Sequence, residues 1–222
     1  MTSTSLPNYN RKEEIMNALT HGLGILMGIA AVVLLAVFSA LYSDAWTIVS
    51  TAIYGTSMIV LYTASTMYHS FSKTKAAQKL NMFDHISIYY LIAGTYTPFT
   101  LVNMREYGAA WGWTIFGIIW ACAIAGTILK LIYGNKLRKV STVIYLIMGW
   151  IIVIAIVPFV KSLETGGLVL MVIGGLSYSL GVIFYKWKSL PFNHAIWHLF
   201  VLAGTVFHFF AILFYVVLKD VH

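Results

Sequence analysis

Seven long stretches of this 222-residue chain contain no aspartate, glutamate, lysine or arginine. These uncharged stretches are residues 15–43, 45–72, 85–104, 107–129, 140–160, 165–185 and 189–218. A helix of roughly 20 apolar residues crosses the ~30 Å hydrocarbon core of a bilayer, and every stretch reaches that length. Only 9% of the residues are charged, against about 25% in a typical soluble domain. The pattern therefore predicts an integral membrane protein and excludes a soluble globular domain.

The length of these stretches also predicts the kind of secondary structure. Membrane-spanning strands need only about ten residues and must close into a barrel, so we expect helices. The expected fold is an all-α membrane protein, a bundle of seven transmembrane helices. A short tail over residues 1–17 precedes a single domain over residues 18–220. Its expected helices are 18–41, 46–69, 82–103, 109–131, 140–160, 165–186 and 192–218.

The basic residues are distributed unevenly between the connections of this bundle. The N-terminal tail and the second, fourth and sixth loops carry eleven lysines and arginines, whereas the other loops and the C-terminus carry three. Because basic residues are retained on the cytoplasmic side, we expect a cytoplasmic N-terminus and an outside C-terminus in the plasma (inner) membrane. This arrangement explains the net charge of +7 without a nucleic-acid partner. The expected partners are membrane lipids, and the oligomeric state stays open.

Polar side chains from several helices should meet at the cytoplasmic ends of this bundle. The second helix ends with Ser65 and His69, the third begins with Asp84 and His85, the seventh begins with His194 and His198, and the first brings His21. Ionisable groups inside a membrane are costly and are therefore commonly functional. A single histidine at a helix end often serves only as an interfacial or hydrogen-bonding residue. The convergence of several such groups at one depth favours a functional site instead.

The histidine spacing suits a metal ion. His194 and His198 lie ~6 Å apart along a helix and are rotated by ~40°, so both imidazoles can reach one cation. With His69 they offer three neutral nitrogens, and three histidines with an open fourth position form a catalytic Zn²⁺ arrangement. Such a zinc ion lowers the pKa of its bound water to about 7. The ligand types do not by themselves select zinc over another divalent metal that binds imidazole.

The remaining polar residues receive less specific roles. Asp84 would be either a further ligand or the base that orients the water, and Ser65 could bind the water, an oxyanion or a ligand. We expect His85 and His21 to support the site indirectly or to pack. His208 lies ~21 Å further along its helix than His194, so we expect it to pack in the outer half. The third helix also contains Tyr89, Tyr96 and Thr97, which line a cavity or belong to the core.

Four motifs together resemble a known family. The segments NALTHGLG, STMYHS, FDHISIYYLIAGTYTPF and HAIWHLFVLAGTVFH occur in this order, and they are similar to the haemolysin III proteins of bacteria. Those proteins belong to the progestin and adipoQ receptor family. The resemblance extends from about Asn17 to Leu218. It implies a zinc site on the cytoplasmic side of a seven-helix bundle, formed here by His69, His194 and His198 together with Asp84 and Ser65.

The resemblance leaves several classes of function open. Eukaryotic relatives resemble lipid amidases that act on ceramide-like substrates. The leading hypothesis is therefore a zinc-dependent hydrolase of lipid amide or ester bonds, with its substrate in the bundle cavity and a role in membrane lipid homeostasis. The alternatives are a non-enzymatic sensor or regulator of lipid state with a structural zinc ion, and a cytolytic membrane protein. No amphipathic insertion element supports cytolysis. A retinal-binding pump is excluded because no lysine lies between Leu199 and Leu218.

Overall fold

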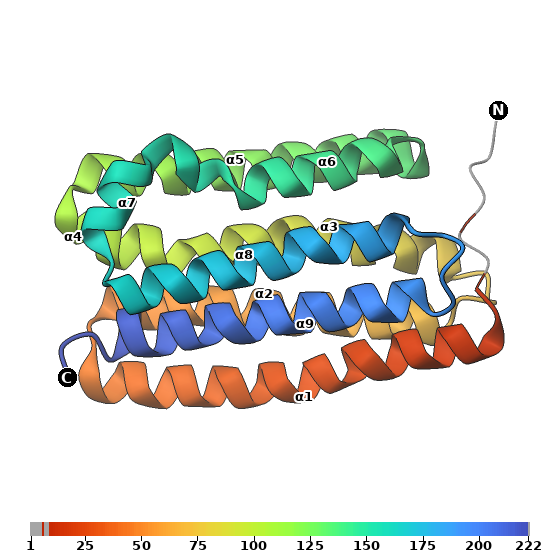
Figure 1. Cartoon of the computed structure of the whole chain (residues 1–222), viewed down its shortest axis with the longest axis horizontal. Coiled ribbons are helices and arrows are strands. Elements are labelled where there is room, and N and C mark those ends of the chain that lie inside the picture. The colour runs from red at the N-terminus through yellow and green to blue at the C-terminus, as the bar shows by residue number, and fades with distance from the viewer. Residues whose placement is uncertain (1–5, 7–8, 222) are drawn as a thin grey trace.

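The computed structural model describes residues 6 and 9–221, without the side chains of residues 135 and 137–139. In this part of the chain the secondary structure is helical, and the long helices run side by side along the longest axis of the molecule (Figure 1). The α-helices are α1 (Arg11–Tyr42), α2 (Ala45–Ser70), α3 (Ala77–Pro98), α4 (Arg105–Tyr107), α5 (Ala109–Tyr133), α6 (Arg138–Gly149), α7 (Ile156–Ser162), α8 (Thr165–Lys186) and α9 (Asn193–Ile212). Tighter or wider helical turns form η1 (Phe99–Met104), η2 (Gly134–Leu137), η3 (Ile151–Ala155) and η4 (Leu213–Val217).

The helices are arranged in layers. α1 packs against α2 and α9, α2 packs against α3, and α3 packs against α5. α8 packs against α9 along most of its length, whereas α6 meets α8 at few positions. In Figure 1, α5 and α6 form one edge of the molecule and α1 forms the opposite edge. The start of α1, the end of α2 and the start of α9 all lie at the right-hand end of this view.

Six helical segments of the described chain are long and apolar enough to cross a membrane, which confirms a multi-pass helical membrane protein. They are α1, α2, α5, Val140–Ser162, α8 and Asn193–Val217. The expected third span, which corresponds to α3, is not among these six, because α3 carries several polar residues that lower its hydropathy. These side chains are buried inside the bundle and do not face lipid: Asn81, Asp84, Ser87, Thr95 and Thr97.

The first helix begins within the stretch that was expected to be a tail. The side chain of Asn10 accepts a hydrogen bond from the backbone N–H of Glu13, and the Glu13 carboxylate accepts one from the Asn10 N–H, each at 3.0 Å. This reciprocal pair is a capping box, which stabilises the start of a helix. α1 therefore begins at Arg11, and the additional turns bring Glu14 and Asn17 into the buried interior.

Irregular turns occur beside the two prolines that lie in long helical segments of the chain. Proline cannot donate a hydrogen bond to the carbonyl four residues before it. Pro98 is followed directly by the π-helical turn η1. Ile154, four residues before Pro158, lies in the 3-10 turn η3. The segment formed by α6, η3 and α7 is consequently less regular than its neighbours.

Close helix packing depends on small residues, as the spacing of Gly24 and Gly28 predicts. A Cβ atom at Gly24 would lie 2.6 Å from the ring of Tyr62, and one at Gly28 would lie 3.1 Å from the Ile59 side chain. Real Cβ atoms do not approach other atoms as closely as 2.6 Å, so glycine permits the contact between α1 and α2 at this level. This contact fixes the part of α1 that carries the polar residues described below.

Replacing Gly24 with alanine should therefore overpack the contact between α1 and α2. We expect Gly24→Ala to destabilise the protein by about 1–3 kcal/mol and to lower its melting temperature in detergent. Gly117→Ala is the matched control, because a Cβ atom there meets nothing within 4 Å, and it also reports the gain of about 1 kcal/mol in helix propensity. Equal melting temperatures for the two variants would contradict this packing.

Candidate metal centre

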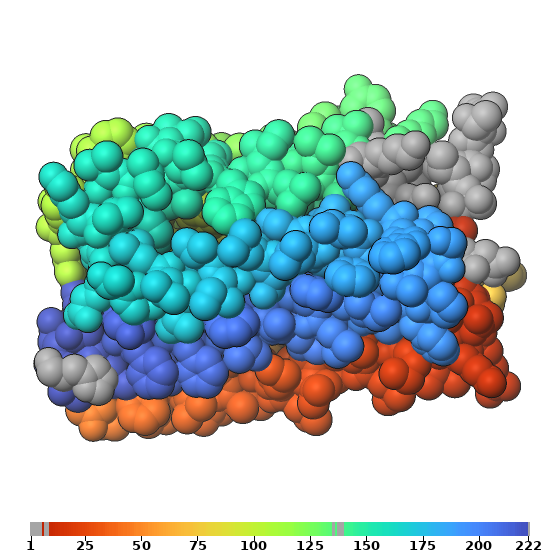
Figure 2. All heavy atoms as spheres, viewed as in Figure 1, coloured from red at the N-terminus to blue at the C-terminus, as the bar shows by residue number. Residues whose placement is uncertain are grey.

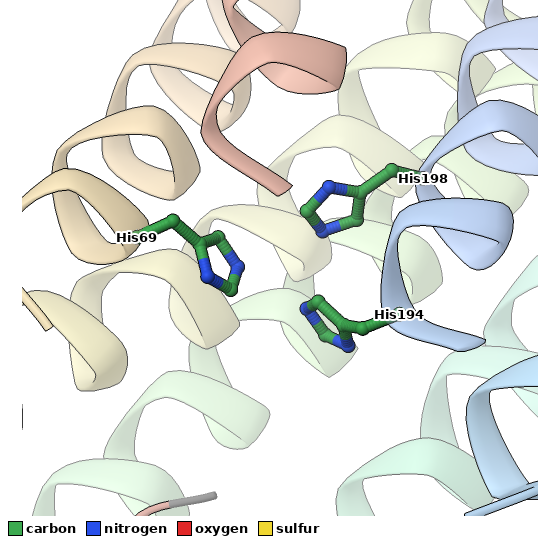
Figure 3. A group of neighbouring side chains, drawn as sticks. All are labelled: His69, His194 and His198. Carbon is green, nitrogen blue, oxygen red and sulfur yellow. The ribbon is translucent and has the colours of Figure 1, made fainter. Parts of the chain in front are cut away.

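Three histidines converge at the ends of α2 and α9. His69 lies in the last turn of α2, and His194 and His198 lie in the first turns of α9. All three are buried, with exposed fractions of 2%, 6% and 0%. One ring nitrogen of each lies within 4.8 Å of those of the other two, and Figure 3 shows the rings facing a common point from opposite sides. These three residues, the histidine triad, could hold one metal ion.

The turn between α8 and α9 places two members of this triad. The backbone at Phe192 is left-handed, with a φ of 56°, and its N–H donates to the carboxylate of Glu13 at 3.2 Å. The Asn193 amide then donates to the carbonyls of Phe184 and Tyr185 at the end of α8, at 3.0 and 3.2 Å. These bonds hold the first turn of α9 against α8 and α1. In this position His194 faces the other two histidines of the triad.

Helix α1 hydrogen-bonds the outer nitrogens of two triad members. Nδ1 of His69 lies 2.7 Å from a carboxylate oxygen of Glu14. Nδ1 of His198 lies 3.0 Å from the hydroxyl oxygen of Thr20 and 3.2 Å from the carbonyl oxygen of Asn17. A carboxylate and a carbonyl only accept hydrogen bonds, so each Nδ1 donates. The Nε2 atom of each ring is then left with a lone pair.

The inner nitrogens of the triad fit a metal ion. Nε2 of His69, Nε2 of His198 and both nitrogens of His194 are buried without a hydrogen-bond partner among the described residues. Buried polar atoms are nearly always hydrogen-bonded, so several unpartnered nitrogens at one point require an explanation. Neutral imidazole nitrogens are suitable ligands for zinc and for several other divalent metals. Ligation would satisfy these atoms together.

Asp84 and Ser65 lie next to the triad but are not part of it. Asp84 is buried on α3. Its carboxylate oxygens are not among the ligand atoms that lie within 4.8 Å of one another, which come from the three histidines. Ser65 lies one turn before His69 on α2, beside the Asp84 carboxyl group. Nδ1 of His85 donates a hydrogen bond to the Asn81 carbonyl oxygen at 2.8 Å and lies 3.6 Å from a carboxylate oxygen of Asp84.

Two charged residues near the triad were not anticipated from the sequence. Glu14 was assigned to the tail, and Lys130, which the expected helix 109–131 contains, was counted among the basic residues of the fourth loop. Both are buried: Glu14 contacts His69, and Lys130 lies on α5, where its charge acts on Asp84. The only available signal was their position at the edge of an uncharged stretch. The basic bias of the connections remains when Lys130 is left out.

The other histidines have distinct surroundings. The His21 ring stacks on His198 with 3.5 Å between ring centroids and an angle of 12°, so it supports the triad by packing. His208 lies further along α9, where its Nε2 donates to the Met171 carbonyl at 3.1 Å. The close approach of His208 to α8 is possible because Gly174 has no side chain.

An apolar cavity of about 270 Å³ extends from the triad between α3, α6, α7, α8 and α9. Asp84 and His194 line one part of it, and apolar side chains such as Phe159 and Leu168 line the rest. Val153 and Val172, which are 57% and 50% exposed, also line it. The cavity therefore reaches the outer surface between α6–α7 and α8, which border one another on the face shown in Figure 2.

Tyr89, Tyr96 and Thr97 of α3 divide between this cavity and the core. Tyr96 lines the cavity, and its hydroxyl donates to the Gly149 carbonyl at 2.8 Å. Tyr89 and Thr97 are fully buried in the packed core. Thr97 accepts a hydrogen bond from the Trp120 indole at 3.1 Å. Tyr96 therefore ties the wall formed by α6 to α3.

Comparison with known proteins identifies the family of this helical bundle. The model of a family described as "Haemolysin-III related" matches residues 9–209, a range that contains the triad, Glu14 and Asp84. The chain belongs to the haemolysin-III family. This finding confirms the resemblance of the four sequence motifs.

Two bacterial haemolysin-III relatives are similar over nearly their whole length. The chain is 47% identical to the "Hemolysin-3 homolog" of Bacillus subtilis over 93% of this chain and 95% of that protein. It is 46% identical to the "Hemolysin-3" of Bacillus cereus over 92% of each protein. The human "Monocyte to macrophage differentiation factor" is 34% identical over 90% of this chain and 83% of its own length. No solved structure matches the chain.

The triad predicts the effect of removing one histidine from this haemolysin-III protein. We expect about one metal ion per wild-type chain and little bound metal in His198→Ala, measured by elemental mass spectrometry after purification in detergent. His208→Gln is the control and should keep its metal, because His208 bonds the Met171 carbonyl outside the triad. Equal metal content in wild type and His198→Ala would contradict a site built on these three residues.

Proposed function

We propose that this haemolysin-III protein is a zinc-dependent hydrolase that cleaves an amide or ester bond of a lipid within the plasma (inner) membrane. One observation carries this proposal: a buried triad of metal-binding type adjoins an apolar cavity that reaches the outer surface of the helical bundle. A purely structural metal site would need no such cavity beside it. The experiments that follow separate these two roles.

The proposed topology has seven membrane spans with a cytoplasmic N-terminus. α3 and η1 form the additional span, and they lie beside the other long helices in Figure 1. Their polar residues are buried in the bundle, so they would not contact the hydrocarbon core. The excess of basic residues then assigns the end of the bundle that carries the triad to the cytoplasmic side. The metal centre would lie near that face.

Asp84 and Ser65 are the proposed reacting groups of the chain. Zinc held by the triad would act as a Lewis acid and activate water for attack on a carbonyl carbon. Asp84 lines the cavity beside His194, where its carboxylate would accept a proton from the water and pass it to the leaving group. Ser65 lies beside Asp84, and its hydroxyl would donate a hydrogen bond to the developing oxyanion.

The lipid would reach this centre from the membrane. The buried ring of Tyr9 lies 5.1 Å from that of His194 and 6.4 Å from that of His69, so it covers the triad toward the start of α1. The cavity is instead open between α6–α7 and α8, through exposed valines. An acyl chain entering there would lie along the apolar walls and present its carbonyl group to the triad.

Replacing the proposed base should separate catalysis from metal binding. We expect Asp84→Asn to keep its metal ion and to reduce hydrolysis by about 10²–10⁴-fold, because proton transfer is lost. Product release from ceramide-like amides and from lipid esters, measured by mass spectrometry, provides the test. If the wild type binds zinc but releases no product from either class, the alternative of a lipid-state sensor with a structural zinc ion replaces this proposal.

Blocking the opening should affect long substrates selectively. A tryptophan at Val172 would fill the gap between α8 and α6–α7, so we expect at least about a tenfold loss of kcat/KM for a long-chain lipid and little change for a short-chain analogue. Val169→Trp is the control, since Val169 is equally exposed on α8 but lies outside the cavity lining. Equal losses in both variants would contradict this route.

A further inference from the structure

A buried carboxylate on α1 contacts the triad from outside. Glu14 is only 7% exposed, and one of its oxygens lies 2.7 Å from Nδ1 of His69. Burial of a carboxylate is costly unless the group is paired or hydrogen-bonded. A carboxylate that is retained in the interior of a membrane bundle therefore indicates a role. No triad member lies on α1, so this role is separate from ligation.

The contact determines which nitrogen of His69 can bind a metal. An ionised carboxylate accepts hydrogen bonds and cannot donate them, so the proton of the neutral ring resides on Nδ1. Nε2 then carries the lone pair, and it is the buried nitrogen without a partner among the described residues. Metal-binding histidines usually have such an outer partner, which fixes the tautomer and the orientation of the ring.

The same helix treats His198 in the same way. Thr20 and the carbonyl of Asn17 contact Nδ1 of His198 and leave its Nε2 free toward the triad. Two histidines from different helices are thus oriented by one face of α1. This agreement is difficult to attribute to packing alone, because both contacts select the same nitrogen.

A purely structural role for Glu14 is weaker than this one. α1 and α2 are already held together by the close contacts at Gly24 and Gly28 and by many others along their length. One further hydrogen bond at the end of α2 adds little to such an interface. It does, however, select the orientation of the buried His69 ring in which Nδ1 faces Glu14 and Nε2 is left without a partner among the described residues.

We propose that Glu14 is a positioning residue that holds His69 in the tautomer and orientation required for metal binding. The inference rests on the proposed metal centre but not on hydrolysis. α1 supplies no histidine of the triad, but its side chains and backbone orient two of the three imidazole rings. The metal affinity should therefore depend on Glu14, although it lies outside the triad. It should not depend on an exposed carboxylate elsewhere in the chain.

The test is a zinc titration of the detergent-purified full chain in competition with a chelator. We expect Glu14→Ala to bind zinc about 10–100-fold more weakly than the wild type. Glu14→Gln keeps the side-chain length and one accepting oxygen but loses the charge, so we expect a smaller loss of about three- to tenfold. Glu164→Ala, an exposed carboxylate beside α8, is the control and should bind as the wild type does.

Histidine ¹⁵N NMR of the zinc-free proteins supplies a second measurement that does not depend on affinity. We expect the His69 signals of the wild type to show protonated Nδ1, and those of Glu14→Ala to show a mixture of tautomers. Wild-type affinity in both Glu14 variants would overturn the proposal, and if only Glu14→Gln folds, wild-type affinity in that variant overturns it. A folded wild type without zinc binding would overturn the metal centre itself, which distinguishes the two failures.

Discussion

The cost of placing polar groups inside a membrane governs the whole structure. Water cannot hydrogen-bond a side chain there, so each buried polar atom needs a partner within the protein. Most of the interior satisfies this requirement through short hydrogen bonds, such as the 2.7 Å bond from Tyr62 to Thr205 between α2 and α9. The inner nitrogens of the triad do not. This concentration of unpartnered imidazole nitrogens at one point supports metal ligation more strongly than the presence of histidines alone.

The cavity follows from how unevenly the helices pack. α1, α2, α3 and α9 contact their neighbours along extended surfaces, and α9 is fixed at its start by Asn193. The segment from α6 to α7 is irregular beside Pro158 and meets α8 at few positions. The tightly packed half therefore holds the triad, whereas the loosely packed half forms the cavity wall and its opening. The proposed metal site would lie in the first half, and the proposed lipid route would run through the second.

Much of this arrangement could be predicted from the sequence because it depends on the period and charge of single segments. Uncharged stretches indicated membrane helices, and the four-residue spacing of His194 and His198 placed both on one helix face. The topology predicted from the distribution of basic residues then placed His69 at the same depth in the membrane. Glu14 was misplaced in the tail, and Lys130 was counted with a loop although the expected helix 109–131 contains it. Each lies at the edge of an uncharged stretch, where sequence does not distinguish a loop from a helix end. For Glu14, the capping box formed by Asn10 and Glu13 starts α1 at Arg11, before the expected helix start at residue 18.

Other features depend on side-chain packing that no linear pattern contains. The sequence left Asp84 open between ligand and base, and its position outside the triad follows from the packing of α3 against α2. The cavity and its opening arise where α6 and α8 meet at only a few positions. The polar residues of α3 lower its hydropathy. They are tolerated because they are buried inside the bundle, and this burial depends on packing.

The central claim is that the three histidines bind one metal ion through their inner nitrogens. X-ray absorption at the zinc edge of the purified, zinc-loaded protein tests it most directly. The account predicts about three imidazole nitrogens at ~2.0–2.1 Å, with oxygen completing the coordination. A spectrum without imidazole scattering, or one that is unchanged when His194 is replaced by alanine, would contradict it.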